Sequence, residues 1–247
     1  MKLLHLYHDF MNLYGEYGNM RVLEKHLRDQ GMNVTVIHKT VTDTDLDFSD
    51  VDLIYIGCGT ERSQKAALMH LMPYQEEIKD ACRRGVVGLF TGNACDILGT
   101  SITDGNGELH PALGLLPFTT NESADIRYTG DAVTTAEPFG KELVGFVNKC
   151  SQNTGIAAPL FTLKMGMGNQ KGDPGEGCRV ENFFGTHLIG PVLVKNPAML
   201  HAVIRLLMKR ENPDASYQAI AYPYEEKAYE VTHRALINRL EETGNRK

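Results

Sequence analysis

The chain has 247 residues, 42% of them hydrophobic, with a formal net charge of −6 and an isoelectric point near 5.8. This length allows one or two domains, and we expect one main domain with a well-buried core. The acidic balance provides no basic field to attract a phosphate backbone. A small molecule or a protein is therefore the expected partner, and nucleic acid is not.

The N-terminus, MKLLHLYHDF, contains a short apolar run that is broken by His5, His8 and Asp9. It is neither a signal peptide nor a membrane span, so we expect a cytoplasmic protein. The spacing of these three residues fits no zinc motif, and no metal is expected. The cysteines form an odd set without C-x-x-C spacing, which favours reduced, mostly buried thiols over a disulfide framework. They are Cys58, Cys82, Cys95, Cys150 and Cys178.

Strand-like and helix-like segments alternate over the first hundred residues, a pattern typical of a parallel sheet covered by helices on both faces. Ligands bind such sheets at the carboxyl ends of the strands, which here are the turns at 57–62 and 91–95. The second of these is a sharp strand-to-helix turn at Gly92. The pattern predicts strands at 1–7, 33–38, 52–56 and 86–90, and helices at 18–31, 63–83 and 92–98.

The second half is less periodic. A glycine-rich segment at 164–179 predicts either a flexible loop that closes over a site or an ordinary hairpin connection. We expect a main domain at 1–210 and a charged helical C-terminal appendage at 211–247, which serves for docking or is simply a solvated helix. The predicted elements are strands at 114–118, 127–136, 143–148 and 183–188, and helices at 197–209 and 224–242.

Several motifs resemble one family, and they occur in that family's order along nearly the whole chain. The family is the glutaminase subunit of lipid II isoglutaminyl synthase, which is related to the amidotransferase domain of cobyric acid synthase. The resemblance implies a class-I glutamine-amidotransferase-like (flavodoxin-like) α/β fold with a mostly parallel sheet and helices on both faces. The motifs are NLYGEYGN at 12–19, GCGTERSQ at 57–64, GLLPF at 114–118, RYTGD at 127–131, VGFVN at 144–148 and GTHLIGPVLVKNP at 185–197.

The chemistry of that family needs a cysteine at the strand-to-helix elbow and a histidine that acts as base and acid. The elbow motif C-G-G-Y-Q-x-L-G of the family places its cysteine on Gly92 of this chain. The histidine of the family's L-H-G-P falls on Ile189. Because neither residue can exchange a proton, the resemblance leaves enzymatic activity open.

Cys95 and His187 are the candidate substitutes for the lost pair. Cys95 lies three residues along the helix from the elbow, about one turn, so its sulfur points elsewhere unless the turn is rebuilt. His187 lies two residues before Ile189, on the same face if the strand continues, and is otherwise a satisfied buried histidine. A relocated nucleophile would require Cys95, His187, Cys58 or Cys150 to converge.

Two further features are candidates for substrate binding. Arg127, in the family's R-x-T-G-D motif, suits a substrate carboxylate, although a surface ion pair is an equal alternative. The turn Gly57-Cys58-Gly59 would aim backbone N–H groups at an oxyanion, with Cys58 where the family has glycine. The alternative for Cys58 is a small buried thiol.

The chain has no P-loop for ATP. In the resembled family the ATP-dependent work belongs to a separate Mur-ligase-like subunit, which amidates the D-glutamate of lipid II. The resemblance therefore implies such a partner, glutamine or another carboxylate as ligand, and no cofactor. We favour a catalytically degenerate binding or regulatory subunit. The alternatives are an active glutaminase that uses Cys95 and His187, or a cobyric-acid-synthase-like amidotransferase.

Overall fold

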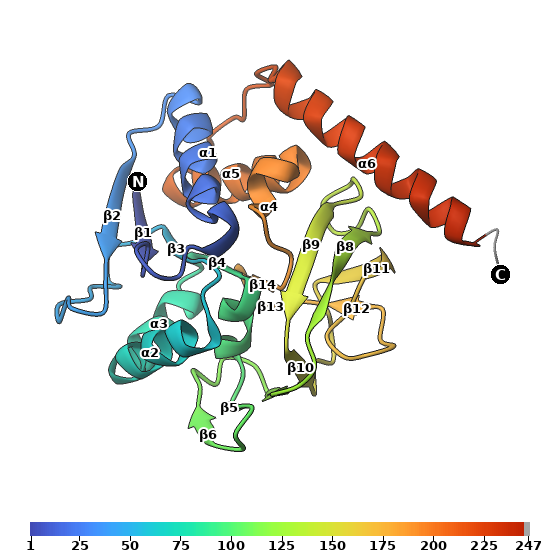
Figure 1. Ribbon diagram of the computed structural model, residues 1–247. Coiled ribbons are helices and arrows are strands. Elements are labelled where there is room, and N and C mark those ends of the chain that lie inside the picture. Colours follow the sequence, from blue (N-terminus) through green and yellow to red (C-terminus); the bar gives the residue numbers. More distant parts are fainter. Residues whose placement is uncertain (245–247) are drawn as a thin grey trace.

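The central feature of the fold is a six-stranded sheet in the order β13-β14-β4-β3-β1-β2, seen in a computed structural model that describes residues 1–244 (Figure 1). All neighbouring strands are parallel except β13, which pairs antiparallel with β14. The sheet consists of β1 (Lys2–Leu6), β2 (Thr35–Lys39), β3 (Leu53–Ile56), β4 (Val87–Thr91), β13 (Cys178–Val180) and β14 (Phe183–Thr186).

Helices cover both faces of this sheet, as the alternating pattern predicts. One hydrophobic core contains Leu68 and Ile78 from α2 and α3, and the other contains Leu23 and Val203 from α1 and α5. The mostly parallel sheet with helices on both faces that the sequence predicts is therefore confirmed. The helices are η1 (Leu13–Gly15), α1 (Tyr17–Asp29), α2 (Glu61–Leu71), η2 (Met72–Tyr74), α3 (Gln75–Arg83), η3 (Gly92–Leu98), α4 (Val192–Lys195) and α5 (Pro197–Glu211).

Two four-stranded sheets lie beside the central one, in the orders β10-β7-β5-β6 and β12-β11-β8-β9 (Figure 1). Their strands come from the weakly periodic half of the chain. The bounds are β5 (Ser101–Thr103), β6 (Leu109–Pro111), β7 (Thr119–Glu122), β8 (Tyr128–Thr134), β9 (Val144–Lys149), β10 (Ser151–Thr154), β11 (Phe161–Met165) and β12 (Gly175–Glu176).

The predicted C-terminal helix is present as α6 (Pro223–Gly244), and it runs alongside β8 and β9 (Figure 1). Its Leu236 packs on Val133 and Val144, and its His233 lies 2.7 Å from the Glu142 carboxylate. The helix is thus docked on the chain itself. The division into a domain at 1–210 and an appendage at 211–247 stays a prediction. No helix of residues 1–244 is long and apolar enough to cross a membrane.

Two predicted elements are wrong. The single helix predicted at 63–83 is interrupted by η2, because Pro73 lacks the backbone N–H that an uninterrupted helix requires. The predicted strand at 114–118 is a turn that caps η3. Gly114 has a φ of +61°, and the N–H groups of Leu115 and Leu116 donate to the Leu98 carbonyl oxygen.

The glycine-rich segment at 164–179 forms a hairpin, the second of its two predicted forms. Thr162 pairs with Gly175 across β11 and β12, and Asn169 bonds both the N–H and the carbonyl of Gly177. The hairpin places the buried carboxylate of Glu176 behind η3, beside His187.

Candidate active site

The turn between β4 and η3 has the shape of a nucleophile elbow. Thr91 ends the strand in an extended conformation, and Gly92 follows with a φ of +60°. Glycine adopts this conformation without steric cost, whereas other residues are strained in it. Position 92 is therefore the tip of a strand-to-helix turn at the carboxyl end of a central strand, but it carries no side chain.

The side chain of Cys58 fills the space that a residue at position 92 would occupy. A Cβ atom built on Gly92 would lie 2.5 Å from the Cys58 Cβ, and it would be closer still to the sulfur. It would also lie 3.0 Å from Cγ2 of Ile189. A cysteine at position 58 and a side chain at position 92 would therefore clash unless one of the two segments moved. This clash links the two replacements, glycine by Cys58 and cysteine by Gly92.

We expect Gly92→Ala to destabilise the fold by about 1–3 kcal/mol from overpacking, in addition to about 1–2 kcal/mol from its left-handed backbone. Gly140→Ala is the matched control, because Gly140 has a φ of +77° and open space around its Cβ direction. Adding Cys58→Gly to Gly92→Ala should recover the overpacking part only. Urea unfolding of these three variants, of Cys58→Gly alone and of the unmodified chain measures this, and additive effects of the two substitutions would contradict the steric link.

The Cys58 thiol lies in surroundings that keep it protonated. Burial is the main cause that raises its pKa to about 12. The carboxylates of Glu16, Glu61 and Asp96 raise the pKa further, and a hydrogen bond from the Asn93 backbone N–H lowers it. A thiolate, and not a thiol, is the nucleophile in cysteine chemistry. Cys58 therefore occupies the place of a nucleophile without the environment that would activate it.

The side chain of Asn93 binds the backbone N–H of Gly59, one of the groups that we expect to face an oxyanion. Its Oδ1 accepts from the Gly59 N–H at 3.0 Å, and its Nδ2 donates to the Gly59 carbonyl at 2.9 Å. The backbone carbonyl of Asn93 in turn accepts from Nε2 of Gln64 at 2.5 Å. The Gly59 N–H is thus already bonded within the protein, and an oxyanion would have to displace the asparagine side chain.

The position of the catalytic base is apolar. Ile189 is buried and bridges to Phe146, and the backbone N–H of the next residue, Gly190, donates to Glu16 Oε1 at 3.1 Å. The Glu16 carboxylate also accepts from the hydroxyl groups of Tyr55 and Thr91. Burial raises the pKa of Glu16 despite these bonds. The carboxylate is thus occupied by hydrogen bonds to the Gly190 backbone and to side chains of β3 and β4.

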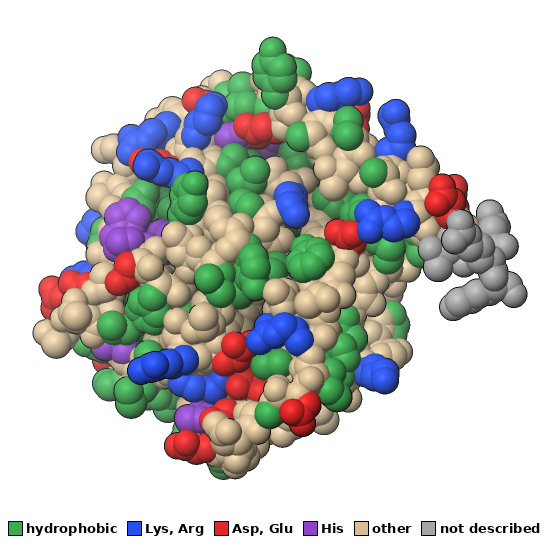
Figure 2. Space-filling view, in the orientation of Figure 1, with side chains coloured by type: hydrophobic (Ala, Val, Ile, Leu, Met, Phe, Trp, Pro, Cys, Tyr) green, Lys and Arg blue, Asp and Glu red, His purple; other side chains and the backbone are tan. Residues whose placement is uncertain are grey.

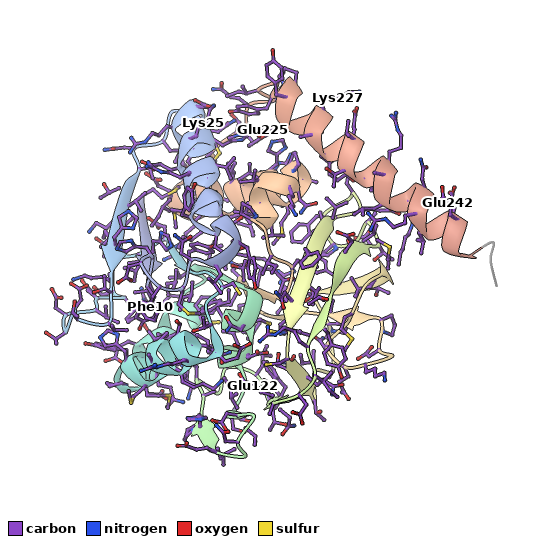
Figure 3. All side chains as sticks on the ribbon, viewed as in Figure 1. Phe10, Lys25, Glu122, Glu225, Lys227 and Glu242 are labelled. Carbon is purple, nitrogen blue, oxygen red and sulfur yellow. The ribbon has the colours of Figure 1, made fainter. Side chains whose placement is uncertain are left out.

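A pocket of about 250 Å³ opens in front of the elbow. Arg127 lies at this pocket, and its guanidinium is 2.5 Å from the Glu61 carboxylate and 3.1 Å from Oδ1 of Asn148. The Cys150 thiol donates to the same Glu61 carboxylate at 3.3 Å. Glu122, at the end of β7, pairs with Lys65 at the edge of this region (Figure 3). The pocket therefore has one arginine that is held by an internal carboxylate.

Cys95 and His187 lie behind the elbow and do not line this pocket. The Cys95 sulfur is 3.6 Å from that of Cys178, and this contact together with burial raises the pKa of Cys95 well above its ordinary value. His187 Nε2 lies 2.9 Å from Asp96, and its Nδ1 lies 3.3 Å from Glu176. The structure brings Cys58, Cys150 and Arg127 together at the pocket and holds Cys95 and His187 in the interior.

Three residues that sequence reasoning passed over shape this site. Asn93 stands where the family's elbow motif has glycine, and this polar replacement is a usable signal. Glu16 stands at a variable position of the first motif, and nothing in the sequence marks it as buried. Asp96, which lines the pocket and binds His187, carries no pattern that identifies it as an internal charge.

The fold is that of the glutamine amidotransferases. The chain superposes on the crystal structure of a glutamine amidotransferase with a TM-score of 0.56 at 13% identity, over 83% of this chain and 98% of that one. For the glutaminase domain of Trypanosoma brucei CTPS with bound acivicin, the TM-score is 0.51 at 9% identity, over 88% and 96% of the two chains. These likenesses concern the fold.

The chain belongs to the CobB/CobQ-like glutamine amidotransferase domain family, whose sequence model matches residues 2–197. It is 32% identical over 196 residues to the GatD subunit of lipid II isoglutaminyl synthase (glutamine-hydrolyzing) of Staphylococcus aureus, covering 79% of both chains. It is 26% identical over 213 residues to the GatD subunit of Streptococcus pneumoniae, covering 85% of this chain and 82% of that one.

Proposed function

We propose that the chain is the glutamine-amidotransferase-like subunit of a lipid II isoglutaminyl synthase that does not itself hydrolyse glutamine. In this role it is a binding or regulatory partner of a Mur-ligase-like, ATP-dependent subunit that amidates peptidoglycan precursor in the cytoplasm. The names of its two GatD relatives support the pathway. The cobyric-acid-synthase-like alternative rests on the match to the CobB/CobQ-like family alone.

One observation carries the proposal: the space of the nucleophile is filled by Cys58, opposite an isoleucine where the base would be. Nucleophilic catalysis requires a thiolate and a base within hydrogen-bonding reach of each other. Cys58 has carboxylates as its titratable neighbours, and these disfavour the thiolate. The alternative that uses Cys95 and His187 requires both groups to leave a buried network before they reach the pocket.

The pocket retains a means of binding a carboxylate, and glutamine is the first ligand to test. Because Glu61 pairs with Arg127, it competes with a ligand carboxylate for the guanidinium. We expect Arg127→Gln to weaken L-glutamine binding by about tenfold, as for loss of a charged hydrogen bond, and Glu61→Gln to strengthen it. Isothermal titration measures both. Arg62→Gln is the control, since Arg62 does not line this pocket. Equal effects of the two arginine substitutions would contradict the assignment.

The test of the proposed function is reconstitution with the Mur-ligase-like subunit of the same organism. We expect the two chains to co-purify, and the complex to amidate a D-glutamate-containing lipid II substrate with ammonium chloride but not with glutamine. A complex in which glutamine supports amidation would show that this chain is a working glutaminase. Failure of the two chains to associate would remove the partner from the proposal.

A further inference from the structure

Three histidines from separate segments converge at the edge of the central sheet, far from the elbow in sequence. His5 on β1 and His38 on β2 are register partners on neighbouring parallel strands. His8 follows β1 in the turn that begins at Tyr7, whose φ is +58°. Together they line a cavity of about 250 Å³, and Figure 2 shows histidine side chains gathered at the surface over this edge. The function proposed above makes no use of them.

His5 is the unusual member of this group. Its side chain is only 2% exposed, and neither Nδ1 nor Nε2 has a hydrogen-bond partner. Buried polar groups in folded proteins are nearly always hydrogen-bonded, and a buried group without a partner is unfavourable. His5 is one of the residues that line the cavity.

The spacing of the three rings matches that of imidazoles around one metal ion. The ring centroids are 5.9 Å apart for His5 and His8, 5.3 Å for His5 and His38, and 4.6 Å for His8 and His38. Three imidazoles bound tetrahedrally to zinc, with Zn–N of about 2.0–2.1 Å, would place their centroids about 5 Å apart. Without the ion, no choice of ring nitrogens brings all three within 4.8 Å. Binding therefore requires ring rotation, which the half-buried His8 and the exposed His38 allow.

We propose that His5, His8 and His38 form a binding site for a divalent transition-metal ion of the zinc type. The sequence did not reveal it because spacing relates only His5 and His8, whereas sheet pairing supplies His38. A metal ion binds the neutral form of each imidazole. Three histidine ligands leave a fourth position for water or another ligand.

The experiment uses the full chain without an affinity tag, treated with chelator and then titrated with Zn²⁺ by calorimetry and with Co²⁺ by visible absorption. We expect one ion per chain at micromolar or lower concentration, and a Co²⁺ spectrum of tetrahedral type. His8→Ala and His38→Ala should each weaken binding by at least about tenfold. Both positions are accessible, so folding should survive, and thermal unfolding without metal checks this.

His110→Ala is the matched control. Among the described residues, His110 forms with Asp104 and Glu108 the group whose ligand atoms already lie within 4.8 Å of one another. The proposal predicts unchanged Zn²⁺ affinity in this variant. It is overturned if the wild-type chain binds no Zn²⁺, if His8→Ala and His38→Ala bind as tightly as wild type, or if only His110→Ala loses the ion. None of these outcomes depends on glutamine chemistry.

Discussion

We expect the fourfold variant Cys58→Gly, Gly92→Cys, Asn93→Gly, Ile189→His to release glutamate from glutamine at least about 100-fold faster than the unmodified chain. Removing the Cys58 side chain clears the space of the new thiol. Glycine at 93 leaves the Gly59 N–H available to an oxyanion. The Cβ direction of residue 92 and Cγ2 of Ile189 are 3.0 Å apart, so a histidine at 189 stands next to the new thiol.

The matched control for this variant has alanine at position 92 and the same three other substitutions. It has the same cleared pocket and the same histidine but no nucleophile, so it should be as inactive as the unmodified chain. Thermal unfolding of both variants establishes that they are folded. A folded cysteine variant that is no faster than its alanine control would mean that residues other than these four silence the site.

The second large effect concerns the buried charges behind the elbow. We expect His187→Gln to lower the free energy of unfolding by about 3–5 kcal/mol, because it leaves buried carboxylates without their cationic partner. Asp96 and Glu176 are both fully buried, and His187 contacts each of them. Lys149 is buried in the same group and compensates only in part. Urea unfolding near neutral pH measures the loss.

This network also predicts how stability depends on pH. Burial and Lys149 lower the pKa of His187, but Cys95 and Asp96 raise it by more, to a net value of about 9 from 6.5. A group whose pKa is raised on folding contributes stability that is fully present below the unfolded value and is lost as pH rises through the folded one. We expect the unmodified chain to lose stability between pH 6.5 and 9, and His187→Gln to lose less over that range.

His110→Gln is the control for both measurements, because His110 pairs with Asp104 at 3.5 Å in a more exposed hairpin. Pairs of this kind contribute about 0–1 kcal/mol. A loss from His187→Gln no larger than that from His110→Gln would contradict the structural importance of the buried network.

The sequence predicted the central sheet and its covering helices because burial on both faces requires continuous apolar strands and amphipathic helices. The strand before Gly92 and the sharp turn there were visible for this reason. The segment at 114–118 is a turn against η3, although its apolar residues predict a strand. An apolar run alone does not distinguish a buried strand from a buried turn. The helix at 63–83 was continued past Pro73 on the strength of its apolar spacing.

From the sequence, the candidate site could be predicted only as a list of positions at which the family's catalytic residues are replaced, without their arrangement in space. Alignment with the family motifs identified Gly92 and Ile189, but each replacement was considered separately. That the Cys58 side chain occupies the space of residue 92 depends on the approach of two loops from different strands, which spacing along the chain does not encode. For the same reason, His187 was considered beside Ile189, whereas its ring points to Asp96 and Glu176.

The most direct test of the central claim is glutamate release from glutamine by the unmodified chain, alone and with its ligase subunit, next to Cys58→Ala and Cys95→Ala. We predict no release above background in any of these samples, since no histidine lies beside the pocket thiols and burial raises the pKa of both Cys58 and Cys150 to about 12. Release by the unmodified chain that either alanine substitution abolishes would contradict the account and identify the relocated nucleophile.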